Sequence, residues 1–122
     1  MSHITGDHLR GHLDTMILAT LEDGEAHGLG VLQRLEAAGC GLLKLKEGSL
    51  YPALYRLEAA GLVASSEQPV PAGQKGAPRR IYRLTRKGKG TLAQGRQQWS
   101  EFVSVISGIL GVTPCLKPSL EN

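Results

Sequence analysis

Residues 44–63 constrain the fold more than any other stretch, because they contain the start, the apolar face and the end of one short helix. Leucines recur at the i, i+4 and i+7 spacing of one helical face, at Leu50, Leu54 and Leu57. Gly48 and Ser49 predict the helix start, which puts Pro52 in the first turn, where a missing N–H costs little. Gly61 predicts the helix end, because glycine readily takes the left-handed conformation found there, and a strand is expected directly after it.

The other side of this helix carries side chains of the types that contact phosphates and base edges in protein–DNA complexes. These candidate DNA contacts are Lys44, Lys46, Ser49, Tyr51, Tyr55 and Arg56. Tyr51 has two interpretations: a packed aromatic ring with an exposed hydroxyl, or a hydroxyl that donates to a phosphate at the helix start. We interpret the helix as the recognition helix of a DNA-binding domain.

Two helices are expected before this one. The first runs from about Asp7, which can cap its start, to Leu21, and the second runs from about Ala26 to Ala38. The glycines on either side of Cys40 then break the chain ahead of the third helix. Two helices joined by a short glycine-containing turn form a helix-turn-helix, in which the second helix enters the major groove of DNA.

After the third helix the pattern changes from helix to strand. Short strands are expected at residues 62–66 and 79–84, and the proline- and glycine-rich segment between them predicts a loop. The resulting β-hairpin is a candidate wing, whose basic residues would neutralise the DNA backbone or enter the minor groove. Its candidate contacts are Lys75, Arg79 and Arg80. A solvated charge pair remains the simpler interpretation of the two arginines.

A long helix is expected from an N-cap at Thr85 to about Leu110. Its apolar residues approximate the seam of a helix that packs on a partner helix. The candidate dimerisation residues are Leu92, Trp99, Phe102, Ile106 and Ile109, together with Leu13 and Ile17 of the first helix. The expected fold is therefore mainly α with a small β-hairpin. It comprises a winged helix-turn-helix DNA-binding domain over residues 1–84, a dimerisation helix over 85–111 and a tail over 112–122, assembled as a homodimer.

The charge of the chain is unevenly distributed. The net charge of the 122 residues is only +3, and residues 1–60 hold five Lys or Arg against eight Asp or Glu. Residues 61–98 instead hold eight Lys or Arg against Glu67 alone. This asymmetry indicates a polyanionic partner bound by the later segment.

The sequence lacks the signatures of several other classes of protein. No nucleophile elbow, glycine-rich phosphate loop or paired carboxylates indicate an enzyme, and no cofactor is expected. His8 and His12 have a spacing that can hold a metal ion, but no accompanying ligand pattern supports a metal site. Cys40 and Cys115 stand alone, and neither a signal peptide nor a membrane-spanning stretch is evident, so we expect a soluble cytoplasmic protein.

Several of these segments match a known family when they are taken together. They are Leu13–Leu18 in the first helix, His27-Gly28-Leu29 at the start of the second, and residues 47–63 and 79–88. In these segments, which lie within residues 9–111, the chain resembles the PadR family of transcriptional regulators, of the short type with one long C-terminal helix. The leucine-tyrosine-proline start and the glycine-leucine end of the third helix are the specific part of the resemblance.

The resemblance implies a winged-helix homodimer that binds an inverted-repeat operator in double-stranded DNA, represses transcription and is released by a small effector. The chain departs from the family pattern at Leu29, where an aromatic residue is usual, and in the long, proline-rich wing loop at residues 68–78. One alternative from another class remains open at this point. A dimeric module could use the same winged helix to bind protein without specific DNA binding.

Overall fold

The computed structural model describes residues 4–5, 12–41, 43–70, 72–73, 75–76 and 78–112. The chain divides into two compact units, Met1–Leu92 and Ala93–Asn122. The predicted cap Asp7, the histidine at residue 8, Cys115 and most of the predicted tail lie outside the described residues.

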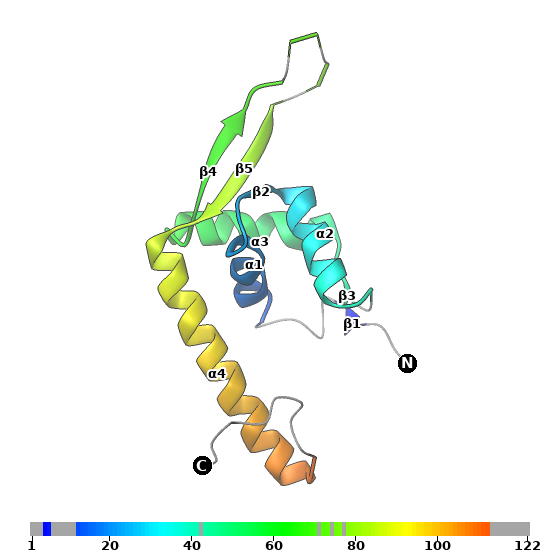
Figure 1. Ribbon diagram of the computed structural model, residues 1–122, viewed down its shortest axis with the longest axis vertical. Helices are drawn as coiled ribbons and strands as arrows, with labels where there is room; N and C mark the ends of the chain where they lie inside the picture. Colours follow the sequence, from blue (N-terminus) through cyan, green and yellow to red (C-terminus); the bar gives the residue numbers. More distant parts are fainter. Residues whose placement is uncertain are drawn as a thin grey trace. The chain divides into compact units, whose positions relative to one another are not determined.

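The first unit contains three complete helices, the beginning of a fourth, and a small antiparallel sheet (Figure 1). The helices are α1 (Leu13–Leu21), α2 (Gly28–Ala38), α3 (Glu47–Ala59) and α4 (Arg86–Leu110). The strands are β1 (Ile4–Thr5), β2 (Ala26–His27), β3 (Leu43–Lys44), β4 (Val63–Gln68) and β5 (Arg79–Leu84). Strands β2, β5 and β4 form the antiparallel sheet in that order, and β1 pairs with β3 in parallel.

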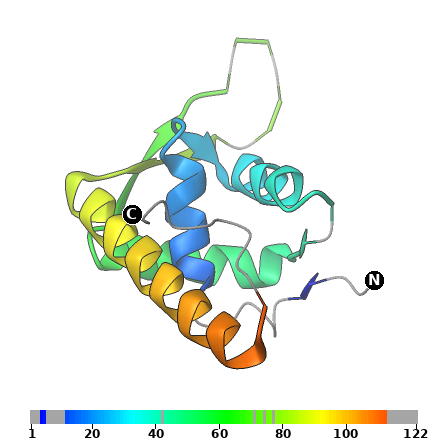
Figure 2. The same ribbon diagram turned by 60° about the horizontal axis from the view of Figure 1, so that its bottom comes forward.

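One hydrophobic core holds this unit together. Helix α1 contacts α2 and α3, and α2 contacts α3 (Figure 2). The largest fully buried side chains are Ile17, Leu18, Val31, Leu50, Leu54, Leu57, Val63, Tyr82 and Leu92. The three leucines of α3 are therefore buried as their helical spacing predicted. The predicted winged helix-turn-helix fold, mainly α with a small sheet, is confirmed.

Some boundaries differ from the sequence-based expectation. Helix α3 begins at Glu47 rather than at Gly48 or Ser49, so Pro52 lies in the second turn and leaves the Gly48 carbonyl without its usual donor within the helix. Helix α1 is first helical at Leu13. The two residues before Gly28 form β2 instead of helix, because they pair with Ile81 and Tyr82 of β5.

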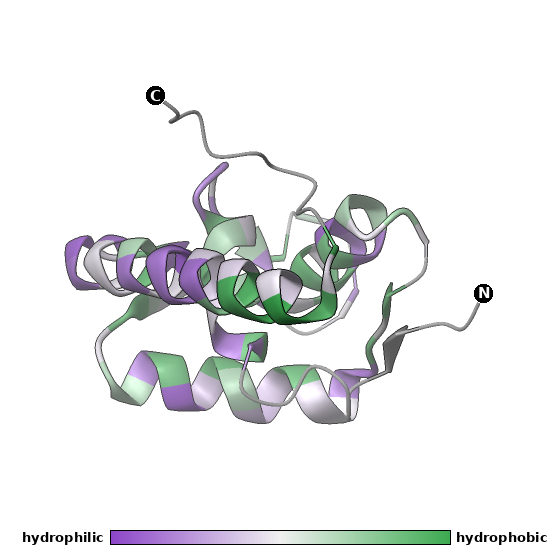
Figure 3. Ribbon diagram, turned by 90° about the horizontal axis from the view of Figure 1, so that it is seen from below, coloured by the Kyte–Doolittle hydropathy of each residue, from purple (hydrophilic) through white to green (hydrophobic). Residues whose placement is uncertain are grey.

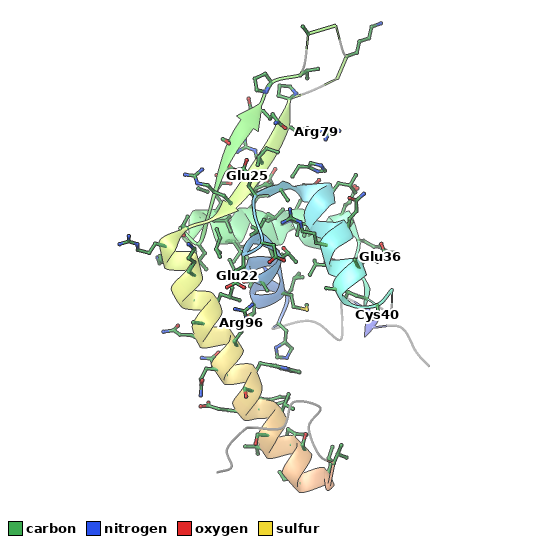
Figure 4. The ribbon with its side chains drawn as sticks, in the orientation of Figure 1. Glu22, Glu25, Glu36, Cys40, Arg79 and Arg96 are labelled. Carbon is green, nitrogen blue, oxygen red and sulfur yellow. The ribbon has the colours of Figure 1, made fainter. Side chains whose placement is uncertain are left out.

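The ends of α2 and α3 share one hydrogen-bonding pattern. In α3, the Gly61 N–H donates to the Glu58 carbonyl at 2.9 Å and the Leu62 N–H donates to the Leu57 carbonyl at 2.9 Å, with Gly61 at φ +78°. This is a Schellman motif, and it confirms the predicted role of Gly61. At the end of α2 (Figure 4) the left-handed position is taken by Cys40, at φ +56°, which costs more than glycine would.

The exit of α3 is bonded directly to the start of α4. The Thr85 hydroxyl lies 2.7 Å from the Gly61 carbonyl, the Thr85 N–H donates to the Leu62 carbonyl at 3.2 Å, and the Gly88 N–H donates to the Thr85 hydroxyl at 3.0 Å. The last of these bonds confirms Thr85 as the N-cap. The Lys87 ammonium also donates to the Ala60 carbonyl at 2.9 Å. This set of contacts, which we call the α3–α4 junction, fixes both helices relative to the hairpin that runs between them.

Gly88 is buried at this junction because nothing larger fits there. A Cβ atom at residue 88 would overlap the Leu62 carbonyl oxygen and would lie 2.7 Å from Leu84 Cδ1. Gly90, two residues further along the same helix, has open space around it.

The second unit consists, in its described part, of the remainder of α4. Its apolar side chains are largely exposed, with Trp99 at 50% and Phe102 at 54%, and the two rings stack with centroids 5.8 Å apart. Ile106 and Ile109 are also exposed. Figure 3 shows the hydrophobic colouring of the last turns of this helix. Such a surface is unusual for a helix that stays in water.

We predict that Gly88→Ala lowers the free energy of unfolding by roughly 1–3 kcal/mol, because the new methyl group overlaps backbone that cannot move without breaking the junction. Gly90→Ala is the matched control. It should raise stability by up to about 1 kcal/mol, because alanine is the better helix former at an open position. Urea unfolding followed by circular dichroism, at one protein concentration, measures both. Equal stabilities of the two variants would contradict this description of the junction.

Candidate nucleic-acid interface

Helix α3 presents a polar face opposite its buried leucines. Lys46 lies at the N-cap position with extended backbone, and the side chains of Lys46, Ser49 and Tyr55 are exposed. Only the backbone of Lys44 is described, in β3. The face therefore offers one ammonium and two hydroxyl groups along its first turns, the groups that contact phosphates and bases in DNA complexes.

Arg56 lies on the same helix but is engaged elsewhere. Its guanidinium Nη2 donates to Asp14 Oδ1 of α1 at 2.8 Å. Both side chains are about half exposed, at 58% and 48%, so this ion pair contributes only roughly 0.2–1 kcal/mol. Its effect is to keep the guanidinium beside α1. The predicted DNA contact by Arg56 would require this pair to open.

Tyr51 joins α3 to the start of α2. Its ring packs so closely on Gly28 that a Cβ atom there would lie 2.5 Å from Tyr51 Cε1 and 2.6 Å from the hydroxyl oxygen. The ring also packs against the hydrophobic core. Tyr51 is thus a packed aromatic residue whose hydroxyl lies at the N-terminus of a helix. The ring is packed, as the first interpretation of Tyr51 predicted. A contact between the hydroxyl and a DNA phosphate remains a prediction.

His27 caps the start of α2. Its Nδ1 accepts a hydrogen bond from the Gly30 N–H at 3.1 Å, and its backbone pairs with Ile81 in the sheet. One residue therefore ends β2, starts α2 and ties both to β5. The sequence analysis used His27 only as part of the family resemblance. Histidine is not among the residue types preferred at an N-cap, so the residue type gave no signal of this role.

The two arginines of the hairpin have different surroundings. Successive residues of a strand point to opposite faces, so Arg79 and Arg80 diverge. Arg80 donates to the Ser65 hydroxyl at 2.8 Å, and Ser65 donates to the Glu58 carboxylate of α3 at 2.6 Å. Arg79, by contrast, is exposed at the end of β5 nearer the hairpin loop (Figure 4), and its side chain has no hydrogen bond or ion pair to any described residue. Lys75, in the loop, is also exposed.

Tyr82 lies beneath these groups and is 2% exposed. Burial raises the pKa of its hydroxyl above the usual value, and the nearby Arg80 charge acts in the opposite direction. The hydroxyl is therefore neutral at physiological pH.

An open pocket of about 290 Å³ lies where α2, α3 and β5 meet, and we call it the wing pocket. Its lining includes His27, Gly28, Tyr51, Arg79, Arg80 and Tyr82. Leu29, the departure from the family pattern, also borders the pocket and is partly exposed. Three predicted DNA contacts, Tyr51, Arg79 and Arg80, are thus brought together, while Lys46, Ser49 and Tyr55 lie on the exposed face of α3.

The candidate dimerisation residues are divided between two environments. Ile17 and Leu92 lie in the core of the first unit, with at most 1% of their surface exposed, and Leu13 packs beside that core. Their apolar spacing therefore reflects packing within one chain. Those in the second unit have exposed side chains: Trp99, Phe102, Ile106 and Ile109.

The described part of the chain contains neither a metal-binding cluster nor a membrane-spanning helix. No three His, Cys, Asp or Glu side chains among these residues lie close enough together to hold a metal ion. No described helix is long and apolar enough to cross a membrane.

Comparisons with known proteins agree with this geometry. Residues 17–94 match the PadR-like family of transcriptional regulators. A transcriptional regulator of Mycobacterium tuberculosis is 36% identical over 92 residues, which cover 75% of this chain and 79% of that protein.

Solved structures give the same result. A transcriptional regulator from Clostridium thermocellum has a TM-score of 0.74 at 30% identity, covering 84% of this chain and 97% of that one. A PadR family transcriptional regulator from Eggerthella lenta has a TM-score of 0.71 at 29% identity, covering 83% of each chain. The chain therefore belongs to the PadR-like family and is a transcriptional regulator, not an enzyme.

Proposed function

We propose that this regulator binds double-stranded DNA as a homodimer and represses transcription from an inverted-repeat operator. The observation that carries the proposal is that Tyr51 of α3 and the two arginines of β5 line one open pocket, while Lys46, Ser49 and Tyr55 are exposed on the same helix. Basic and hydroxyl groups from a recognition helix and a wing at one place suit the phosphate-lined grooves of a duplex. A DNA-bound repressor of this kind would act in the cytoplasm.

The residues have separate roles in this proposal. Lys46 and Ser49 contact DNA at the start of α3, with Lys44 just before it, and Tyr55 faces the groove. Arg79 and Lys75 contact the DNA backbone beside the wing. Arg80 contacts DNA as well and keeps its hydrogen bond to Ser65. Phosphate contacts from these groups would set the register, and the exposed side chains of α3 would read the sequence.

Dimerisation supplies the specificity that one recognition helix lacks. The apolar residues of the second unit would pack on a partner chain, which removes their surface from water. Two recognition helices would then meet successive major grooves, roughly 34 Å apart on one face of the DNA. A small effector that alters this spacing would release the DNA.

We predict that binding to a duplex from the chain's own promoter region weakens steeply with salt, with a log–log slope of several units. Arg79→Ala should make the slope shallower by about one unit per protomer, because it removes one phosphate contact. Arg83→Ala is the matched control, since Arg83 lies on the same strand face and carries the same charge but is remote from the wing pocket. Fluorescence anisotropy titrations at several salt concentrations measure these slopes.

A shuffled duplex of equal length tests specificity in the same titrations. Tighter binding to the promoter duplex than to the shuffled one supports an operator. Equal binding to both, or no binding to either, would contradict the proposal and favour a winged helix that binds protein.

We also predict that Ile106→Glu shifts the protein from dimer to monomer, because it places a charge in the apolar interface. Ser104→Glu, which adds the same charge on the opposite side of the helix, should leave the dimer intact. Sedimentation equilibrium gives the mass of each species directly. A monomeric wild type, or a dimeric Ile106→Glu variant, would rule out an interface on this face of α4.

A further inference from the structure

The wing pocket contains several groups that favour an anion, although they come from separate parts of the chain. Arg79 and Arg80 contribute positive charge, Tyr51 contributes a hydroxyl, and the first turn of α2 contributes backbone N–H groups with the positive end of the helix dipole. No Asp or Glu is among the described residues that line it. The carboxylate of Glu58 accepts a hydrogen bond from the Ser65 hydroxyl, which in turn accepts one from Arg80.

His27 adds a donor of a defined kind. Because the Gly30 N–H donates to Nδ1, that nitrogen cannot carry a proton, and the neutral ring must hold its proton on Nε2. The cap on α2 therefore fixes the tautomer of the ring. Among the described residues, no partner accepts from Nε2, and His27 is one of the residues that line the pocket. The ring thus has one nitrogen used for structure and one available for a ligand.

We propose that the wing pocket holds one phosphate group of the DNA backbone and that the Nε2–H of His27 donates to it. The inference rests on the proposed function, since it names the contact that this pocket makes when the duplex is bound. An open pocket suits a phosphodiester better than a free ion, because the sugar on either side must leave the pocket. In this arrangement one phosphate bridges the start of α2, Tyr51 and the wing arginines, so the three elements dock in one register.

The geometry provides variants that separate the cap from the phosphate contact. In His27→Ser the hydroxyl still accepts from the Gly30 N–H, and serine is among the best N-cap residues, but the side chain has no group at the position of Nε2. His27→Asp also caps the helix well, and its negative charge should repel a phosphate. Both variants should therefore unfold at the same urea concentration as wild type or higher.

We predict that His27→Ser binds the promoter duplex roughly tenfold more weakly than wild type, and that His27→Asp binds more weakly still. Because neutral His27 releases no counterion, the salt slope of His27→Ser should equal that of wild type, unlike the slope of Arg79→Ala. Anisotropy titrations give both values. A purely structural role for His27 predicts no loss of affinity in either variant, because both variants keep the cap on α2.

Duplexes with a single neutral methylphosphonate locate the contact. At one phosphate in each half-site, the methylphosphonate should lower the DNA affinity of wild type strongly and that of His27→Ser much less. At other positions it should lower the affinities of the two proteins equally. If wild type binds DNA with the expected salt slope but both variants bind equally well, the inference is wrong and the proposed function stands. If wild type binds no duplex, both fail.

A free phosphate ion could make the same contacts in the wing pocket as a phosphate of the DNA backbone. Inorganic phosphate is the probe that separates these two ligands. The melting temperatures of wild type and His27→Ser are measured in phosphate and in chloride at the same ionic strength. Phosphate should raise the melting temperature of wild type no more than that of His27→Ser. Selective stabilisation of wild type, with equal DNA affinities, would assign the pocket to a free anion and overturn the proposal.

Discussion

The α3–α4 junction is the contact on which the arrangement of the DNA-facing groups depends. The chain leaves α3 at Gly61 and forms the hairpin. It then returns at Thr85, which donates hydrogen bonds to the Gly61 and Leu62 carbonyls. Gly88 lets α4 approach the Leu62 backbone without a side chain between them. Because both ends of the hairpin are fixed at one place, the wing cannot shift along α3 without breaking these hydrogen bonds.

A second connection works from the other end of the sheet. β2 pairs with β5, and His27 passes directly from that strand into the cap of α2. Gly28 then receives the ring of Tyr51 from α3. The recognition helix, the helix before it and the wing are thus joined around the wing pocket by backbone pairing and close packing, the interactions that hold a binding site to sub-ångström accuracy.

Sequence reasoning predicted the parts of this structure that local signals determine. The leucine spacing of α3, the glycine at its end, the N-cap Thr85 and strand β5 all follow from short-range preferences, and the structure has them. It did not predict β2, whose two residues are strand only because β5 is beside them. It also grouped Ile17 and Leu92 with the dimer seam, because an apolar helical spacing looks the same whether it packs within a chain or between chains.

The candidate site was predictable as a set of residue types and less so as a geometry. Tyr51, Arg79 and Arg80 were identified from their chemistry, but their meeting with His27 depends on a turn of the chain between α1 and α2 that no motif specifies. Arg56 was also identified from its chemistry, but the structure pairs it with Asp14. That partner could not be predicted, because it is 42 residues away in sequence.

The most direct test of the account is amide hydrogen exchange, measured with and without the promoter duplex. The account predicts slower exchange in DNA at the first turns of α2 and α3 and at the start of β5, with little change on the α1 side of the first unit. Protection confined to residues 93–110, or no protection in the presence of DNA, would contradict the claim that these three elements form the DNA-binding surface.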